Sequence, residues 1–138
     1  MANALFDQGR EDFLAGTLDW DANEFRVALV DDTDVTFNLG VNDFWDDLVP
    51  GLVHANAESD ALASKTTTDG VADAADKTLS SVTGDAADYV ICFKETGNDA
   101  TQNLVFALDS ATTGIPVTPN GGDITVAWDG GANKIFKL

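Results

Sequence analysis

Histidine and cysteine, the side chains that most often bind zinc, occur once each in this sequence, as His54 and Cys92. A zinc site of the usual kind takes three or four such ligands, so these two residues do not predict one. None of the serines has the G-x-S-x-G context that marks a nucleophile on a sharp turn. We therefore expect His54 to be a structural or surface residue, and Cys92 to pack as a small hydrophobic side chain in a strand.

Carboxylates are the abundant reactive group, with 20 aspartates and 4 glutamates. A two-carboxylate glycosidase needs one acid with a raised pKa in a cleft, and nothing in the sequence singles out such a pair. In "DWDANE", Asp19, Asp21 and Asn23 have the first three ligand spacings of an EF-hand calcium loop. Glu24 then stands where that loop requires glycine, and Val30 where it requires glutamate. We favour a turn here over a calcium site, and expect neither an enzyme nor a bound cofactor.

Two glycine-rich segments, "NGGD" at 120–123 and "DGG" at 129–131, resemble phosphate-binding loops. Neither is followed by a lysine at the Walker spacing, and no predicted helix begins after either one. We interpret both segments as turns.

The charge balance is strongly acidic, with a formal net charge of −17. Such a surface repels nucleic-acid phosphates and anionic lipids, so neither nucleic acid nor a membrane is an expected partner. No apolar run has the length of a membrane span, and the N-terminal residues lack the features of a signal peptide. We therefore expect a soluble protein made in a cytoplasm. The excess of aspartate over glutamate favours turns over helices.

The apolar spacing predicts one short helix over 4–15, with Asn3 as its N-cap and Gly16 as its C-terminal cap. A further helical turn is expected at 43–48. Alternating apolar residues in "EFRVALVD" predict a half-buried strand at 24–31. Weaker strands are expected at 35–39, 51–57, 61–68 and 78–82, with a turn at Asp69-Gly70. A flexible excursion is the competing interpretation of residues 58–88.

The segment "YVICFKETGNDATQNLVFALD" predicts a β-hairpin around a two-residue turn at Gly97-Asn98. That turn sets Phe93 opposite Gln102, Ile91 opposite Leu104 and Tyr89 opposite Phe106. Cys92 then lies on the other face, opposite Asn103. This register gathers the apolar side chains on one face, and a slip of one residue would scatter them.

A second hairpin is predicted at the end of the sequence, where Ile124, Val126 and Trp128 alternate with polar or small residues. A loop with an odd number of residues places these three opposite Leu138, Phe136 and Lys134. The final strand then packs on its own domain, with Phe136 and Leu138 in the core.

These segments amount to seven to nine short strands and one helix within a single domain, 1–138. The pattern predicts a mainly β fold, an antiparallel β-sandwich or jelly roll with a short N-terminal helix.

In "NDFWDDLVPG", Phe44 and Trp45 lie beside three aspartates. An exposed aromatic pair there would suit partner docking. We favour the alternative, in which the turn plugs one end of the sandwich.

The two ends of the sequence, "MANALFDQGREDFLAGTLDWDANEFRVALVD" and "GIPVTPNGGDITVAWDGGANKIFKL", resemble a family of small structural proteins of tailed bacteriophages. Within that family the sequence looks most like a capsid cementing, or decoration, protein. The resemblance implies a small β-rich domain on the outside of the phage head that clamps neighbouring major capsid subunits. It supplies no catalytic residues. A tail or fibre-associated structural protein is the alternative.

The resemblance leads to expectations about partners. The major capsid protein is the expected partner, the expected location is the capsid exterior of the virion, and a homodimer or other homo-oligomer suits a clamp. The stretch 130–138 contains two lysines and no acid, so it is the least negative region. We therefore expect Lys134, Phe136 and Lys137, together with Phe44 and Trp45, to contribute to the partner interface.

Overall fold

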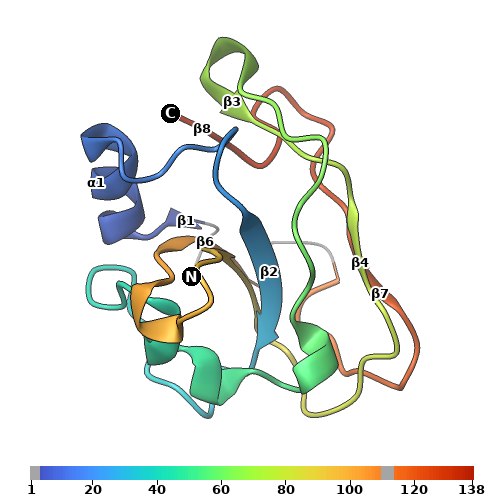
Figure 1. The fold of residues 1–138 in the computed structure, drawn as a ribbon. Helices are drawn as coiled ribbons and strands as arrows, with labels where there is room; N and C mark the ends of the chain where they lie inside the picture. Colours follow the sequence, from blue (N-terminus) through green and yellow to red (C-terminus); the bar gives the residue numbers. More distant parts are fainter. Residues whose placement is uncertain (1–3, 110–113) are drawn as a thin grey trace.

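A four-stranded antiparallel sheet forms the centre of the molecule (Figure 1). The structure, a computed structural model, describes residues 4–109 and 114–138. The strand order is β1 (Ala4–Leu5), β6 (Leu104–Leu108), β5 (Tyr89–Lys94) and β2 (Phe25–Val30). The sheet therefore joins the start of the described chain to its middle.

Two smaller antiparallel sheets lie beside this central sheet, and each has two strands. One pairs β3 (Val71–Ala72) with β8 (Phe136–Lys137), and the other pairs β4 (Lys77–Leu79) with β7 (Ile124–Val126). Among the described residues, α1 (Asp7–Ala15) is the one α-helix. Short 3₁₀ turns occupy Trp45–Asp47, Val49–Gly51, Ala55–Ala57, Thr68–Gly70 and Asp99–Thr101. The prediction of a mainly β protein with one helix is confirmed.

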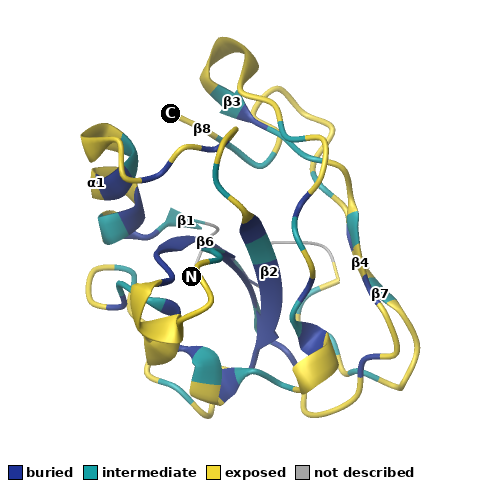
Figure 2. Ribbon diagram, viewed as in Figure 1, coloured by how far each residue is buried: buried dark blue, intermediate teal, exposed yellow. Residues whose placement is uncertain are grey.

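Both faces of the central sheet are buried, as the dark blue of β2 in Figure 2 illustrates. On β2, Val27 and Leu29 belong to one hydrophobic cluster, whereas Ala28 and Val30 belong to a second cluster. Side chains alternate between the faces of a strand, so the sheet separates the two clusters. The strand at 24–31 was therefore placed correctly, but its predicted half-burial is wrong.

Helix α1 begins later than the sequence pattern suggests. Ala4 and Leu5 pair with Ala107 and Phe106 of β6, so the first turn of the predicted helix is a strand instead. The proposed N-cap, Asn3, lies outside the described residues. At the other end Gly16 adopts φ +79°, and its N–H donates to carbonyl oxygens of the last turn. The C-terminal cap is confirmed, because this left-handed conformation favours glycine.

The hairpin of β5 and β6 is confirmed, but its predicted register is wrong. Phe93 lies opposite Leu104, and Cys92 lies opposite Phe106 rather than Asn103. Ile91 lies opposite Ala107 rather than Leu104, and Phe106, the predicted partner of Tyr89, pairs with Cys92, so the register differs by three positions here. A bulge between Cys92 and Phe93 and the 3₁₀ turn Asp99–Thr101 lengthen the connection. The register was predicted by assuming that apolar side chains gather on one face of the hairpin. Both faces are buried, so this assumption does not identify the register.

The predicted C-terminal hairpin does not form. β7 pairs with β4, and β8 pairs with β3, so both strands find partners from the middle of the chain. Phe136 is half-buried and packs against the first cluster, but Leu138 is 64% exposed and is not a core residue. Alternation identified which segments are extended, but it does not identify their partners.

Two weaker strand predictions, 35–39 and 51–57, are also wrong. Val35, Phe37 and Leu39 alternate because they pack as a loop onto the second cluster. Leu52 makes only an isolated bridge to Val30 of β2. Of the strands expected at 61–68 and 78–82, only the second overlaps a named strand, β4. The turn at Asp69-Gly70 is confirmed, with both residues at positive φ. No helix among the described residues is long and apolar enough to span a bilayer.

Candidate interaction surface

The residues predicted to form a partner interface lie on opposite faces of the central sheet. Trp45 is 1% exposed, and its indole stacks on Phe93 with ring centroids 4.6 Å apart. Both rings belong to the second cluster, whereas Phe136 packs against the first. Trp45 therefore has almost no surface to offer a partner in this conformation, which agrees with the plug alternative.

Phe44 is half-buried beside Trp45 and forms an isolated antiparallel bridge with Asn103. The carboxylate of Asp47 accepts hydrogen bonds from the backbone N–H of Asp43, at 2.9 Å, and of Phe44, at 3.4 Å. The Asp47 contacts close the turn, and the hydrogen bond from Leu104 N–H to the carbonyl of Asp43, at 3.0 Å, holds it against the start of β6. The two aromatic residues thus serve packing, with part of Phe44 left accessible.

The other three predicted residues lie together, on β8 and in the turn before it. Phe136 packs among aromatic rings, with ring centroids 5.6 Å from Phe13 of α1 and 5.4 Å from Trp20. Lys134, at φ +48°, forms an ion pair of 3.8 Å with Asp73. Lys137 is exposed, and no ion pair or hydrogen bond of its side chain occurs among the described residues. We call Lys134, Phe136 and Lys137 the β8 surface.

A groove of about 320 Å³ runs along one side of the β8 surface, between α1 and β3. Its lining is mainly apolar and includes Phe13, Leu18, Trp20, Phe136 and Leu138. A second groove, of about 430 Å³, lies on the other side of β8 and extends to β1. β8 is therefore bordered by two grooves, of which the first is mainly apolar and the second is half polar.

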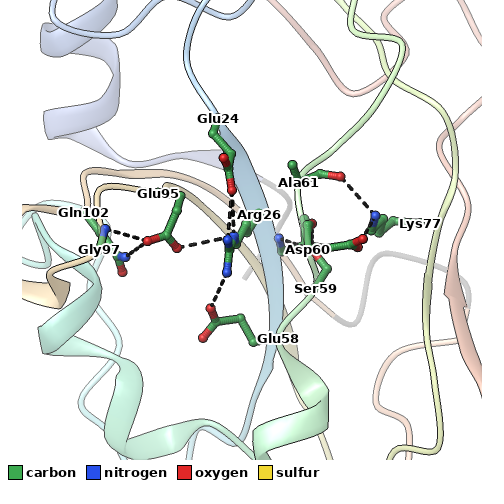
Figure 3. A network of polar contacts seen from close by, with 11 residues as sticks. Glu24, Arg26, Glu58, Ser59, Asp60, Ala61, Lys77, Glu95, Gly97 and Gln102 are labelled. Atoms are coloured by element: carbon green, nitrogen blue, oxygen red, sulfur yellow. Dashed lines mark hydrogen bonds and ion pairs between the residues drawn. The ribbon is translucent and has the colours of Figure 1, made fainter.

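The largest network of charged side chains surrounds Arg26 of β2 (Figure 3). Its guanidinium lies 2.9 Å from a carboxylate oxygen of Glu24, 3.4 Å from Glu95 and 3.6 Å from Glu58. Desolvation acts to lower the pKa of Arg26, but the three carboxylates outweigh it and raise the pKa. The pKa of Glu58 is raised, chiefly by desolvation and further by Glu95 and Asp99.

The Arg26 network does not have the geometry of a glycosidase pair. Glu58 lines an open polar groove of about 560 Å³, whereas Glu95 is not among the residues that line it. Arg26 lies between the two carboxylates, as Figure 3 shows. We interpret the network as a structural tie between β2, the segment at Glu58 and the β5–β6 connection. Glu58 and Glu95 are more than thirty positions from Arg26 in the chain, so the sequence gives no local signal for the network.

Two groups of aspartates could hold a cation by distance alone. One contains Asp31, Asp32 and Asp88, and the other contains Asp31, Asp34 and Asp85. The carboxylate of Asp31 accepts hydrogen bonds from Thr33, which lower its pKa. Desolvation and the charge of Asp88 raise the pKa of Asp32. The Asp31 carboxylate thus binds the loop at Thr33, whereas those of Asp32 and Asp88 repel each other. The spacing of these aspartates in the sequence did not predict that they lie together.

The segment proposed as an alternative calcium loop is a hydrogen-bonded turn. The carboxylate of Asp19 accepts from the N–H groups of Asp21 and Ala22, each at 3.0 Å. The side chain of Asn23 accepts from the N–H of Asp19 at 2.9 Å. Asp19 and Asn23 therefore bind the backbone of their own turn, as short Asp and Asn side chains commonly do, and Asp21 accepts from the hydroxyl of Thr67.

The remaining candidates have structural positions. The Asn120 side chain accepts from Gly122 N–H, and the Asp129 side chain accepts from Gly131 N–H, so both glycine-rich segments are turns. The imidazole Nδ1 of exposed His54 accepts from the N–H of Asn56. Cys92 is fully buried, and this burial raises the pKa of its thiol well above the usual value.

Comparison with known proteins adds no assignment to these observations. No protein-family model matches the chain, and no curated protein matches it.

Proposed function

We propose that this protein is a capsid cement protein of a tailed bacteriophage, which binds the outside of the head and clamps neighbouring major capsid subunits. The proposal combines the resemblance of the two ends of the sequence with the character of the surface. The observation that supports it best is the β8 surface, where a half-buried aromatic ring lies between two lysines in a chain of net charge −17. Such a patch suits protein contact, because aromatic anchors contribute much of the binding energy at interfaces.

The overall charge supports a position on the exterior of the shell. Packaged DNA would repel a protein with 24 acidic and 7 basic residues. Within this proposal, the fold is a small irregular sandwich, in which the β3–β8 and β4–β7 pairs form the second layer over the first cluster. Several weak contacts with an assembled lattice, made at once by one protein or by a homodimer, would give tight attachment.

The decisive experiment is quantification of this polypeptide in purified phage particles, with its location on head or tail determined by labelling. A cement protein is expected in hundreds of copies per head, and its removal should lower the temperature at which the shell breaks. A few copies that co-purify with tails would support the alternative of a tail or fibre-associated protein. Absence from particles would contradict both functions.

A double substitution tests the contribution of the β8 surface. Lys134→Gln with Lys137→Gln removes two positive charges and should lower occupancy on isolated heads and weaken its salt dependence. Ser80→Glu with Thr118→Glu changes the net charge equally at exposed positions that line neither groove beside β8. Equal occupancy of the two double variants would show that Lys134 and Lys137 have no specific role in attachment.

A further inference from the structure

Lys137 differs from every other basic residue of the chain. Each of the other six contacts an oxygen atom: carboxylates for Arg10, Arg26, Lys77 and Lys134, and backbone carbonyls for Lys65 and Lys94. Within the described part of the chain, Lys137 alone makes no such contact. In a protein with 24 acidic residues, this free ammonium group is available to an anionic partner.

Lys137 lines the groove of about 430 Å³ between β8 and β1. Leu5 of β1 forms the opposite side, and the apolar lining between them includes Phe106, Leu108 and Ile135. Arg10 also lines the groove, although its guanidinium is paired with Asp7. None of the described lining residues carries a carboxylate side chain. The groove therefore combines apolar side chains with an equal share of polar surface, and its charged side chains are both positive.

Among the strands that the structure describes, β1 and β8 both lie at the edge of their sheets. In an antiparallel pair, successive residues direct their main-chain N–H and C=O groups alternately toward and away from the partner strand. Phe6 N–H donates to Val105 at 3.0 Å, so the main-chain groups of the preceding residue, Leu5, point away from β6. Leu138 N–H donates to Gly70 at 3.0 Å, so those of Lys137 point away from β3.

The geometry points to β-strand addition: we propose that the groove between Leu5 and Lys137 binds an extended segment of a partner protein in which carboxylates flank apolar side chains. Edge strands with free main-chain groups are templates for an added strand. The apolar lining accepts alternate side chains of that strand, and Lys137 pairs with a carboxylate. Under the proposed function the segment belongs to the capsid, and the inference depends on that function only for the identity of the partner.

A peptide-binding experiment tests this inference without phage particles. The probe is a blocked seven-residue peptide with alternating glutamate and valine, added to the ¹⁵N-labelled full chain and followed by NMR. The amide signals of Leu5 and Lys137 are expected to shift in a saturable way. A matched peptide with lysine in place of glutamate should bind at least about fivefold more weakly, since it loses the ion pair and gains repulsion.

Two charge-reversal variants separate a specific contact from general charge. Lys137→Glu should weaken binding of the glutamate–valine peptide about fivefold or more, with an unchanged melting temperature because the side chain is exposed. Lys134→Glu is the matched control, because its ammonium pairs with Asp73 and it does not line this groove. Lys134→Glu should weaken binding of the glutamate–valine peptide by less than about twofold.

Three results would overturn the inference. The amides of Leu5 and Lys137 could fail to shift at millimolar peptide, or the two peptides could bind equally well. Alternatively, diluting the protein alone could move the same signals, which would identify a second copy of this chain as the occupant. Failure of peptide binding with abundant protein on heads would leave the cement function intact, while binding without head association would contradict that function alone.

Discussion

The indole of Trp45 lies parallel to the ring of Phe93, with an interplanar angle of 9° and a centroid separation of 4.6 Å. This stack joins the turn that follows Asp43 to the central strand β5 and closes one side of the second cluster. Trp45, one of the residues predicted for the partner interface, is therefore part of the core.

Replacing Trp45 should strongly destabilise the fold. Trp45→Ala is expected to lower the free energy of unfolding by about 3–5 kcal/mol, because it leaves a cavity beside Phe93. Urea denaturation followed by circular dichroism measures the change. Leu14→Ala is the control, since Leu14 is 89% exposed. This substitution should change the free energy of unfolding by less than about 0.5 kcal/mol. Equal midpoints for both variants would contradict the core position of Trp45.

Gly9 allows helix α1 to approach the main chain of β6. A Cβ atom at this position would lie 2.8 Å from the carbonyl oxygen of Leu104 and 3.0 Å from that of Val105. Gly9→Ala, which stabilises an ordinary helix by about 0.5–1 kcal/mol, should here destabilise the protein by about 1–3 kcal/mol. Thermal unfolding measures the change, with the exposed Glu11→Ala on the same helix as control. A higher melting temperature for Gly9→Ala would show that α1 can move away from β6.

Stability should depend on the protonation of Glu58. Because desolvation and nearby carboxylates raise its pKa in the folded state, the ionised form is disfavoured by folding. This cost is present at pH 7 and disappears as the pH falls through the raised pKa toward the ordinary value. The contribution of Glu58 to stability therefore increases as the pH decreases.

Glu58→Gln tests this sign, because glutamine resembles the protonated acid. The variant should melt at a higher temperature than the parent at pH 7, and the difference should shrink at pH 5. Glu11→Gln, at an exposed position outside the Arg26 network, controls for the loss of one negative charge. If Glu58→Gln melts lower than the parent at pH 7, the ion pair with Arg26 outweighs desolvation.

The thiol of Cys92 should react only after unfolding. Burial raises its pKa, so little thiolate is present at pH 8, and the sulfur has no access to reagent in the folded protein. A disulfide reagent should label the native chain slowly and the urea-unfolded chain at once. Labelling of the native protein at the unfolded rate would mean that the β5–β6 hairpin opens readily.

The β5–β6 hairpin shows what a local pattern can and cannot predict. The two strands were predicted from the apolar residues on either side of Gly97-Asn98, and Gly97 indeed has the positive φ, +83°, that a tight connection requires. Their register depends on the bulge at Cys92 and on packing against both clusters. Because both faces of these strands are buried, apolar residues occur on both faces. The distribution of apolar residues along the strands therefore does not tell which register buries more surface.

The β8 surface shows the same limit for a possible site. The absence of acids in the stretch 130–138, around Lys134 and Lys137, is visible in the sequence and is the basis for predicting that this segment contacts a partner. Only the tertiary structure pairs Lys134 with Asp73 and leaves Lys137 beside the edge of β1. These contacts join residues more than sixty positions apart, so no short-range signal could predict them.

By itself, the sequence determined the mainly β character, the end of α1 at Gly16, the aspartate- and glycine-rich turns and the acidic surface. Each of these follows from the backbone preferences or charge of the residues concerned. Tertiary structure alone decided that β7 pairs with β4, that β8 pairs with β3 and that Trp45 is buried. It also decided that the Lys137 side chain has no ion pair or hydrogen bond with another described residue. Strand partners and burial depend on packing between distant segments, which compete for the same apolar surface.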